Sequence, residues 1–428
     1  MINTKNIRLI IYPQKIQIGI SIIVLLFFYL FPIRFPFIPL SSDYILAVVG
    51  LFLFLIKRTH IPYYISNYYS LISLLFIFSL FSKVYNQSFD FYPEKQIILW
   101  YIYPLAVYPL FILLDQKKIK ITPDKFFFFI IICFDIQGIL SLVIFFNDTF
   151  REIFLNYFGG KEIDKLEHFG SFRLLAIAKP ELQYANMAIM YGLASFACLI
   201  NIKTKNRFNF SICSLILFLI CGVLSGRSYF IVFGLSIFII SYEFIKKNLL
   251  NIIKLIIYVF VFFLILIIIF LYFYKNNDNN TTFLWAFEIF INLIENGNLD
   301  FQTGEVMKSM YIFPDKISTY LIGDNRISNG FGGTYMDTDI GYIRFLFCWG
   351  IIGSLLLYSI QIYKLFTLRK INNLKEYNNF YLLLFLILFI YLSKDLYSIF
   401  NWIILIYYIN YRKHKNKNIY LSSNKYAS

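Results

Sequence analysis

The amino-acid sequence predicts an all-α protein that crosses a membrane about twelve times. Of its 428 residues, 59% are hydrophobic and 21% are aromatic, and the mean hydropathy is +0.67. A soluble domain with this composition could not cover its surface with polar atoms. Many of the apolar residues fall into runs of roughly 20, the length at which a helix crosses a bilayer core of about 30 Å. A helix is the expected form because it satisfies its own backbone hydrogen bonds in lipid.

Twelve apolar runs are candidates for these spans. In chain order they cover residues 16–32, 43–56, 66–82, 96–114, 126–147, 182–200, 209–225, 229–245, 255–274, 340–360, 379–392 and 397–411. The second, eleventh and twelfth are the shortest. The first run follows Lys5, Arg8 and Lys15 and has no small-residue cleavage site after it, so we expect a span and no cleaved signal peptide.

The distribution of cations predicts the orientation, because cytoplasmic connections of membrane proteins are enriched in Lys and Arg. If the N-terminus is cytoplasmic, 24 of the 39 Lys and Arg residues fall on the cytoplasmic side. Only four acidic residues share that side, so we expect both termini in the cytoplasm. The net charge of +15 is then a topology signal that suits contact with anionic inner-leaflet lipid, and it does not indicate nucleic-acid binding.

The sequence gives no sign of a metal site. Its five cysteines lie in or beside the expected spans without metal-ligand spacing, and its three histidines are scattered. We therefore expect no disulfide framework, no metal and no cofactor.

Two outer connections are long enough to hold a functional site. The first, residues 148–181, is dense in charge and contains His168. The second, residues 275–339, includes the apolar segment 283–294, which is too short to span and predicts a helix lying in the interface or packed over the spans.

Two arginines on the outer side are candidates for catalysis. Arg227 lies in a tight Ser-Gly-Arg-Ser turn between the seventh and eighth spans, where Ser225 and Ser228 add hydroxyl donors suited to a diphosphate. An interfacial anchor is the alternative reading of Arg227. Arg173 precedes the sixth span, where a helix start can present backbone N–H groups to an anion. A salt bridge with Glu181 is the alternative there.

The most informative segment runs from Gly323 through a glycine-rich loop into the tenth span. Arg326 and Arg344 bracket it, and Gly332 could bring a backbone amide close to a phosphate or sugar. An ordinary flexible loop is the equal alternative. Because an arginine in lipid is costly unless it is paired or faces the bundle, we expect Arg344 to point inward near Asp339.

These motifs resemble those of the Wzy-type O-antigen and capsular polysaccharide polymerases, and of the wider superfamily that they share with O-antigen ligases. The resemblance covers the whole chain as an architecture. At the level of motifs it rests on Arg173 followed by Pro180, on Ser225-Gly-Arg-Ser228, and on Asp339-Ile-Gly-Tyr-Ile-Arg344 followed by Gly350-Ile-Ile-Gly353.

The resemblance implies a metal-independent, GT-C-like membrane glycosyltransferase. It would join oligosaccharide repeat units on undecaprenyl diphosphate at the periplasmic face of the bacterial cytoplasmic membrane, alongside the flippase and chain-length regulator of the same pathway. The expected catalytic residues are Arg173, Arg227, Glu181 and Asp339. The expected substrate-binding residues are Arg326, Arg344, Ser225, Ser228, Gly332, Tyr342 and His168.

Two alternatives stay open. Ligases of this superfamily carry an important histidine in the large outer loop, but residues 275–339 contain none. Some polymerases have an acid immediately before the proline, where this chain has Lys179, and that departure puts the role of Glu181 in doubt. A lipid-linked oligosaccharide flippase or other transporter commonly shows internal repeats, mid-span ionisable residues or broken helices. We find no repeat, and Asp135 is the only mid-span acid, so charge in the outer loops favours an enzyme.

Overall fold

The computed structural model describes residues 4–35, 38–57, 63–117, 122–159, 173–179, 183–204, 207–245, 288, 291–292, 308–329, 335–338, 340–371, 375–393 and 405. The described chain is mostly helical, with one short antiparallel hairpin of β1 (Arg34–Phe35) and β2 (Ile38–Ser41). The long helices are α1 (Thr4–Leu30), α2 (Ser42–Lys57), α3 (Tyr63–Tyr85), α4 (Tyr92–Gln116), α5 (Pro123–Phe146), α8 (Ala185–Lys203), α9 (Phe208–Ser225), α10 (Ser228–Ile245), α15 (Gly341–Ile371) and α16 (Lys375–Ser393). The short ones are α6 (Asp148–Phe154), the π-helix η1 (Leu155–Gly159), α14 (Ile317–Ile322) and the 3₁₀-helix η4 (Tyr335–Asp337).

The all-α class predicted from the sequence is confirmed for this part of the chain. Each of the ten long helices overlaps one expected span. Of the remaining two expected spans, 255–274 lies outside the described residues and 397–411 is described only at Leu405. By length and composition, six described helices can cross a membrane: α3, α4, α5, α8, α9 and α15. The total of twelve spans stays a prediction.

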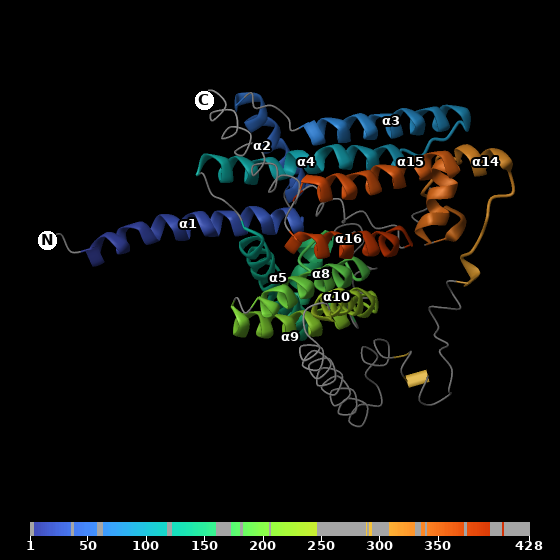
Figure 1. Ribbon diagram of the computed structural model, residues 1–428. Coiled ribbons are helices and arrows are strands. Elements are labelled where there is room, and N and C mark those ends of the chain that lie inside the picture. Colours follow the sequence, from blue (N-terminus) through green and yellow to red (C-terminus); the bar gives the residue numbers. More distant parts are fainter. Residues whose placement is uncertain are drawn as a thin grey trace.

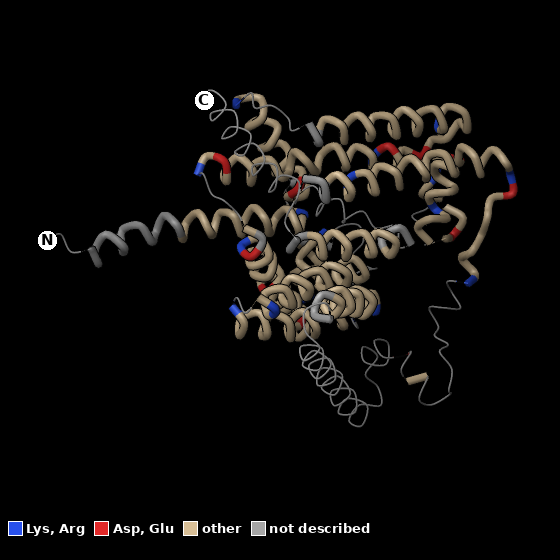
Figure 2. The backbone as a smooth tube through the Cα atoms, viewed as in Figure 1, with Lys and Arg blue, Asp and Glu red and all other residues tan. Residues whose placement is uncertain are grey.

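The helices pack as two groups joined by α1 and α16 (Figure 1). In the first group α4 packs against α2 and α3, and α3 packs against α15. In the second group α8 contacts α5, α9 and α10, and its side chains are buried along almost its whole length. Figure 2 shows most of the charged residues near the ends of helices, with long uncharged stretches between them. This pattern is the one expected for helices whose middles lie in lipid.

Helix α15 is broken near its beginning, which corrects the expectation of a continuous span over 340–360. Gly350 has φ 61° and ψ −169°, a conformation that is essentially restricted to glycine. At the break, the backbone N–H groups of Asp324 and Asn325 donate to the carbonyls of Phe347 and Cys348, at 2.5 and 3.0 Å. The loop that follows α14 therefore supplies hydrogen bonds to α15 where the helix is interrupted, as buried backbone requires.

The two backbones touch at this point because both carry glycine. A Cβ on Gly350 would lie 2.4 Å from the carbonyl carbon and oxygen of Leu321. A Cβ on Gly323, which has φ 77°, would lie 2.5 Å from the carbonyl of Cys348. Any other residue at either position would clash with backbone and force a positive φ on a side chain that disfavours it.

The sixth expected span also needs a corrected boundary. The apolar run predicts it at 182–200, but α8 begins only at Ala185. Tyr184 has φ 54° and ψ −107° and so cannot belong to the helix. The preceding Gln183 uses its side chain to hold the neighbouring loop, which delays the start of the helix.

Gly350→Ala tests the break. We expect a loss of at least ~1–3 kcal/mol in the free energy of unfolding, the cost of one residue held in a strained backbone region. Thermal unfolding of the purified protein in detergent would measure it. Gly234→Ala is the matched control, because a Cβ there meets nothing within 4 Å in α10, and it should be neutral or slightly stabilising. Equal behaviour of the two variants would contradict this description of α15.

Candidate functional site

Arg173 and Arg227 lie close to each other. The backbone N–H of Leu174 donates to the carbonyl of Leu224 at 3.0 Å, which ties the loop 173–179 to the end of α9. Burial, as the main cause, and the positive charge of Arg227 together lower the pKa of Arg173 to about 10, while Tyr184 acts in the opposite direction. The Arg173 guanidinium stays protonated at neutral pH with this pKa, and the loop and the turn between α9 and α10 therefore bring two arginines to one region.

The loop that carries Arg173 is held at several points. The side-chain amide of Gln183 accepts from the N–H of Ala176 at 2.7 Å and donates to the carbonyls of Ala176 and Ala178. At the end of the loop, the N–H of Lys179 donates to the carbonyl of Pro32 at 2.7 Å. The Lys179 ammonium pairs with the buried carboxylate of Asp43 at 2.9 Å. Lys179, the departure from the polymerase pattern, thus anchors the loop to the start of α2.

The turn between α9 and α10 is packed against the start of α8. Ser225 donates its hydroxyl to the carbonyl of Cys221 at 2.7 Å, and Ser228 donates to the carbonyl of Ala185 at 3.3 Å. Both hydroxyls therefore help to fix the turn in this structure, and their expected binding of a diphosphate stays a prediction. The arrangement leaves Arg227 projecting from a turn that its neighbours hold in place.

A third charged residue joins this pair. Arg227 forms an ion pair with Glu288, and the side chains are only 17% and 23% exposed. Glu288 was not among the residues that the sequence singled out. The sequence could have drawn attention to Glu288, because it is the only charged residue in the apolar segment 283–294. Residues 288 and 291–292 of that segment are helical, in agreement with the expected short helix.

Arg326 belongs to a second group of residues, around α14 and the start of α15, which lies apart from the α9–α10 turn in Figure 1. Its side chain is exposed, and its guanidinium carbon is 5.8 Å from the centre of the Tyr335 ring. The Tyr335 hydroxyl donates to the carboxylate of Asp324 at 3.2 Å, and Thr319 donates to the other oxygen at 2.7 Å. Burial and the charge of Asp324 raise the pKa of Tyr335, which keeps this hydroxyl protonated.

Of the remaining residues that the sequence predicts for the site, some lie within the described residues and others lie outside them. Arg344 is partly buried in the first turns of α15, and Tyr342 is exposed there, with its ring 6.3 Å from that of Tyr311. His168, Glu181, Gly332 and Asp339 lie outside the described residues. The expected neighbourhood of Asp339 and Arg344 therefore stays a prediction.

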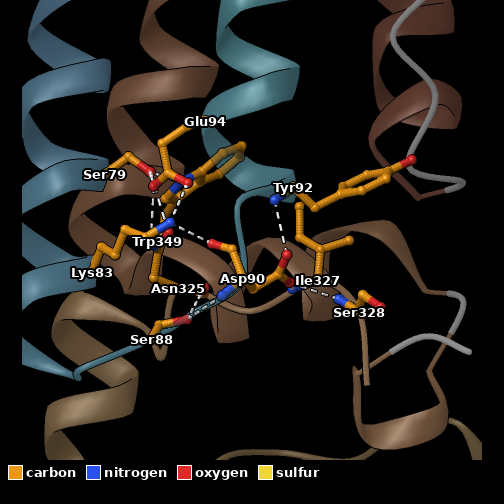
Figure 3. Close-up of polar contacts among 10 residues, drawn as sticks. All are labelled: Ser79, Lys83, Ser88, Asp90, Tyr92, Glu94, Asn325, Ile327, Ser328 and Trp349. Atoms are coloured by element: carbon orange, nitrogen blue, oxygen red, sulfur yellow. Dashed lines mark hydrogen bonds and ion pairs between the residues drawn. The ribbon is translucent and has the colours of Figure 1, made fainter. Parts of the chain in front are cut away.

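Sequence reasoning missed a polar cluster between α3, α4 and the loop after α14 (Figure 3). Its centre is the buried carboxylate of Glu94, which pairs with Lys83 at 3.0 Å and accepts from Ser79 and from the side-chain amide of Asn325. The indole N–H of Trp349 donates to Ser79 at 3.2 Å, which brings α15 into the same cluster. Asn325 and Trp349 are more than 200 positions away from the α3 and α4 residues in the chain, and hydrophobic periodicity carries no information on contacts at that distance.

The mid-span acid Asp135 has a partner on a neighbouring helix. Ser214 of α9 donates its hydroxyl to Asp135 at 2.8 Å. Such a contact is typical of an acidic residue that faces the interior of a helix bundle.

Within the described ranges, no group of three or more His, Cys, Asp or Glu side chains could hold a metal ion. Comparison of the chain with protein-family models, with curated proteins and with solved structures gave no match.

Glu288→Gln tests whether Arg227 belongs to an anion site. The carboxylate of Glu288 competes with any anion for the Arg227 guanidinium, so its removal should strengthen anion binding. We expect the affinity for inorganic pyrophosphate to rise about five- to tenfold, the equivalent of roughly 1 kcal/mol for one partly exposed ion pair. Titration of the purified protein in detergent would measure it. Arg227→Gln should weaken binding, and an unchanged affinity in both variants would remove Arg227 from the site.

Proposed function

We propose that this chain is a membrane glycosyltransferase that polymerises polysaccharide repeat units. In this proposal it acts on oligosaccharides linked to undecaprenyl diphosphate, at the periplasmic face of the bacterial cytoplasmic membrane. The observation that carries the proposal is the proximity of Arg173 and Arg227, two cations from separate segments, beside a bundle of apolar helices. The resemblance of the surrounding motifs to those of the polymerase family indicates which reaction to propose.

The arginine pair suits the leaving group of that reaction. As the acceptor hydroxyl bonds to the anomeric carbon of the growing glycan, the bond from that carbon to the lipid diphosphate breaks. The diphosphate leaves with the bonding electrons and gains negative charge. Two guanidinium groups in a partly buried site stabilise this charge, because they offer planar pairs of donors to phosphate oxygens.

The acceptor hydroxyl must also lose its proton, and a carboxylate is the usual base for this step. Glu288 is in contact with Arg227 and therefore joins Glu181 and Asp339 as a candidate for that role. In the proposal, the anionic substrate takes the place of Glu288 on Arg227 and leaves the carboxylate available to the acceptor.

Contacts between the connections support placing both candidate sites, the arginine pair and the group around α14, on the same side of the membrane. Lys179 binds Asp43, Leu174 binds Leu224, and Asp90 binds the backbone of Ile327. Each contact joins two connections that the cation pattern assigns to the periplasmic side. A flippase that delivers the lipid-linked units and a chain-length regulator are the partners that this placement suits.

A transporter of lipid-linked oligosaccharide is the second candidate, favoured by one observation. The break in α15 brings a loop and a buried ion pair, Lys83 with Glu94, to an interrupted helix. Interrupted helices and buried ionisable residues commonly form the binding sites of transporters. We prefer the polymerase because the arginine pair, which lies away from the break in α15, matches the chemistry of a diphosphate leaving group.

Deletion of the gene separates these functions. If the chain is a polymerase, the deletion strain should carry lipid cores that bear a single repeat unit, because flipping and ligation still operate. Gel analysis of the extracted glycolipid would measure the length distribution. Loss of all repeat units from the core would instead indicate a flippase or a ligase, and the polymerase assignment would be withdrawn.

Arg173→Ala and Arg227→Ala test the chemistry in the complemented strain. Each should lower polymerisation by about 10²–10³-fold, the usual cost of removing one donor that stabilises transition-state charge. Lysine should rescue only in part, since it keeps the charge and loses the planar geometry. Arg151→Ala is the control, because Arg151 pairs with the exposed Asp148 on α6 and should stay within a few-fold of wild type. Normal polymer from Arg227→Ala at full protein level would return Arg227 to an interfacial anchor.

A further inference from the structure

We propose that the connection between α3 and α4, together with the first turn of α4, is a positioning device for Arg326, with Asp90 and Glu94 as its two positioning residues. The proposal rests on the proposed function and on the expectation from the sequence that Arg326 binds the lipid-linked glycan. It assigns a role to two acidic side chains that neither the arginine pair nor the chemistry of the leaving group requires. The contacts that carry it lie on both sides of Arg326 in the chain (Figure 3).

On the N-terminal side, Asn325 is fixed through both its backbone and its side chain. It is fully buried and has φ 50°, which few residues other than glycine adopt. Its side-chain amide donates to Glu94 at 2.9 Å and its side-chain oxygen accepts from Ser79 at 3.2 Å. Its carbonyl accepts from the hydroxyl of Ser88 at 2.9 Å, and its N–H donates to Cys348.

On the C-terminal side, one carboxylate oxygen of Asp90 holds two successive backbone groups. The N–H of Ile327 and the N–H of Ser328 donate to it at 2.8 and 2.9 Å. Ile327 is itself buried, and its carbonyl accepts from the N–H of Tyr335 at 2.9 Å. Ile327, like Asn325 on the other side of Arg326, is thus both buried and held by hydrogen bonds.

Arg326 is the exposed residue between these two anchors. Its backbone has little freedom, because both neighbours are buried and hydrogen-bonded, whereas its guanidinium reaches the face of Tyr335. Holding a binding group in one geometry before the ligand arrives removes the entropy cost of ordering it afterwards. A loop with ordinary turn residues would leave Arg326 free to sample many positions.

The buried ion pair of Lys83 and Glu94 indicates a role beyond joining α3 to α4. Glu94 and Lys83 are both largely buried, and burying such a pair costs desolvation that a pair of apolar side chains would avoid. Lys83 also donates to the carbonyl of Asp90 at 2.7 Å, so it ties the two positioning residues to each other. A buried ion pair of this kind is better suited to fixing one arrangement than to adding stability.

A double-mutant cycle tests the proposal. The variants are Asp90→Ala, Arg326→Ala and the double variant, compared at equal protein level with an undecaprenyl-diphosphate-linked repeat unit as substrate. We expect each single change to raise KM by about 10–100-fold and to leave kcat within a few-fold, since a displaced binding group loses much of its effect. The double variant should be no worse than Arg326→Ala, because Asp90 acts through Arg326.

Two further variants separate positioning from general stability. Asp90→Asn keeps one acceptor oxygen and should recover most of the loss in Asp90→Ala. Asp148→Ala removes an exposed acid on α6, with its side chain 81% exposed, and should change neither constant. Effects of Asp90→Ala and Arg326→Ala that multiply in the double variant would overturn the proposal.

Amide hydrogen exchange provides a readout that does not depend on activity. Asp90→Ala should speed exchange at Ile327 and Ser328 in the purified protein, and unchanged exchange would overturn the positioning role. If exchange rises but neither variant alters KM, Arg326 is not a binding residue and the inference fails while the polymerase assignment stands. If the wild-type chain forms no polymer, the proposed function fails, and without it Arg326 has no glycan to bind and the positioning role fails with it.

Discussion

The interruption of α15 at Gly350 is the constraint on which the arrangement of α14, of the loop after it and of α15 depends. A helix that breaks in an apolar environment exposes carbonyl groups that water cannot reach, and each one costs several kcal/mol unless it finds a donor. The N–H groups of Asp324 and Asn325 are those donors. Gly323 and Gly350 allow the two backbones to approach, and the side chains of Asn86 and Ser88, in the connection between α3 and α4, hold the approaching loop. One local break therefore fixes the positions of α14, of the loop that follows it and of Arg326.

The other candidate site follows the same principle with different residues. Arg173 lies on a loop without regular secondary structure, and such a loop needs partners for its own backbone. Gln183, the carbonyl of Pro32 and the end of α9 supply them. The ion pair of Lys179 with Asp43 adds a charged anchor at the start of α2. In both places an arginine that is proposed to bind substrate is carried by a short segment that several helices hold.

The sequence predicted the helices better than the contacts. Apolar runs located all ten long helices of the described chain, because the length of a hydrophobic run is a local property of the chain. The same reasoning missed the break at Gly350, since the run from 340 to 360 stays apolar on both sides of Gly350 and nothing in it shows a positive φ. It selected Arg173 and Arg227, which prove to be close together. It missed Glu94, Asp90 and Glu288, whose meaning depends on partners from distant segments.

Reconstitution shows whether the chain itself extends a glycan carried on a lipid diphosphate, as proposed. The purified protein would be inserted into vesicles with undecaprenyl-diphosphate-linked repeat units as the only glycan, and the products would be separated by length. We expect chains of many repeat units, together with release of undecaprenyl diphosphate in proportion to the bonds formed. Repeat units that stay single, with no release of the lipid diphosphate, would contradict the proposal.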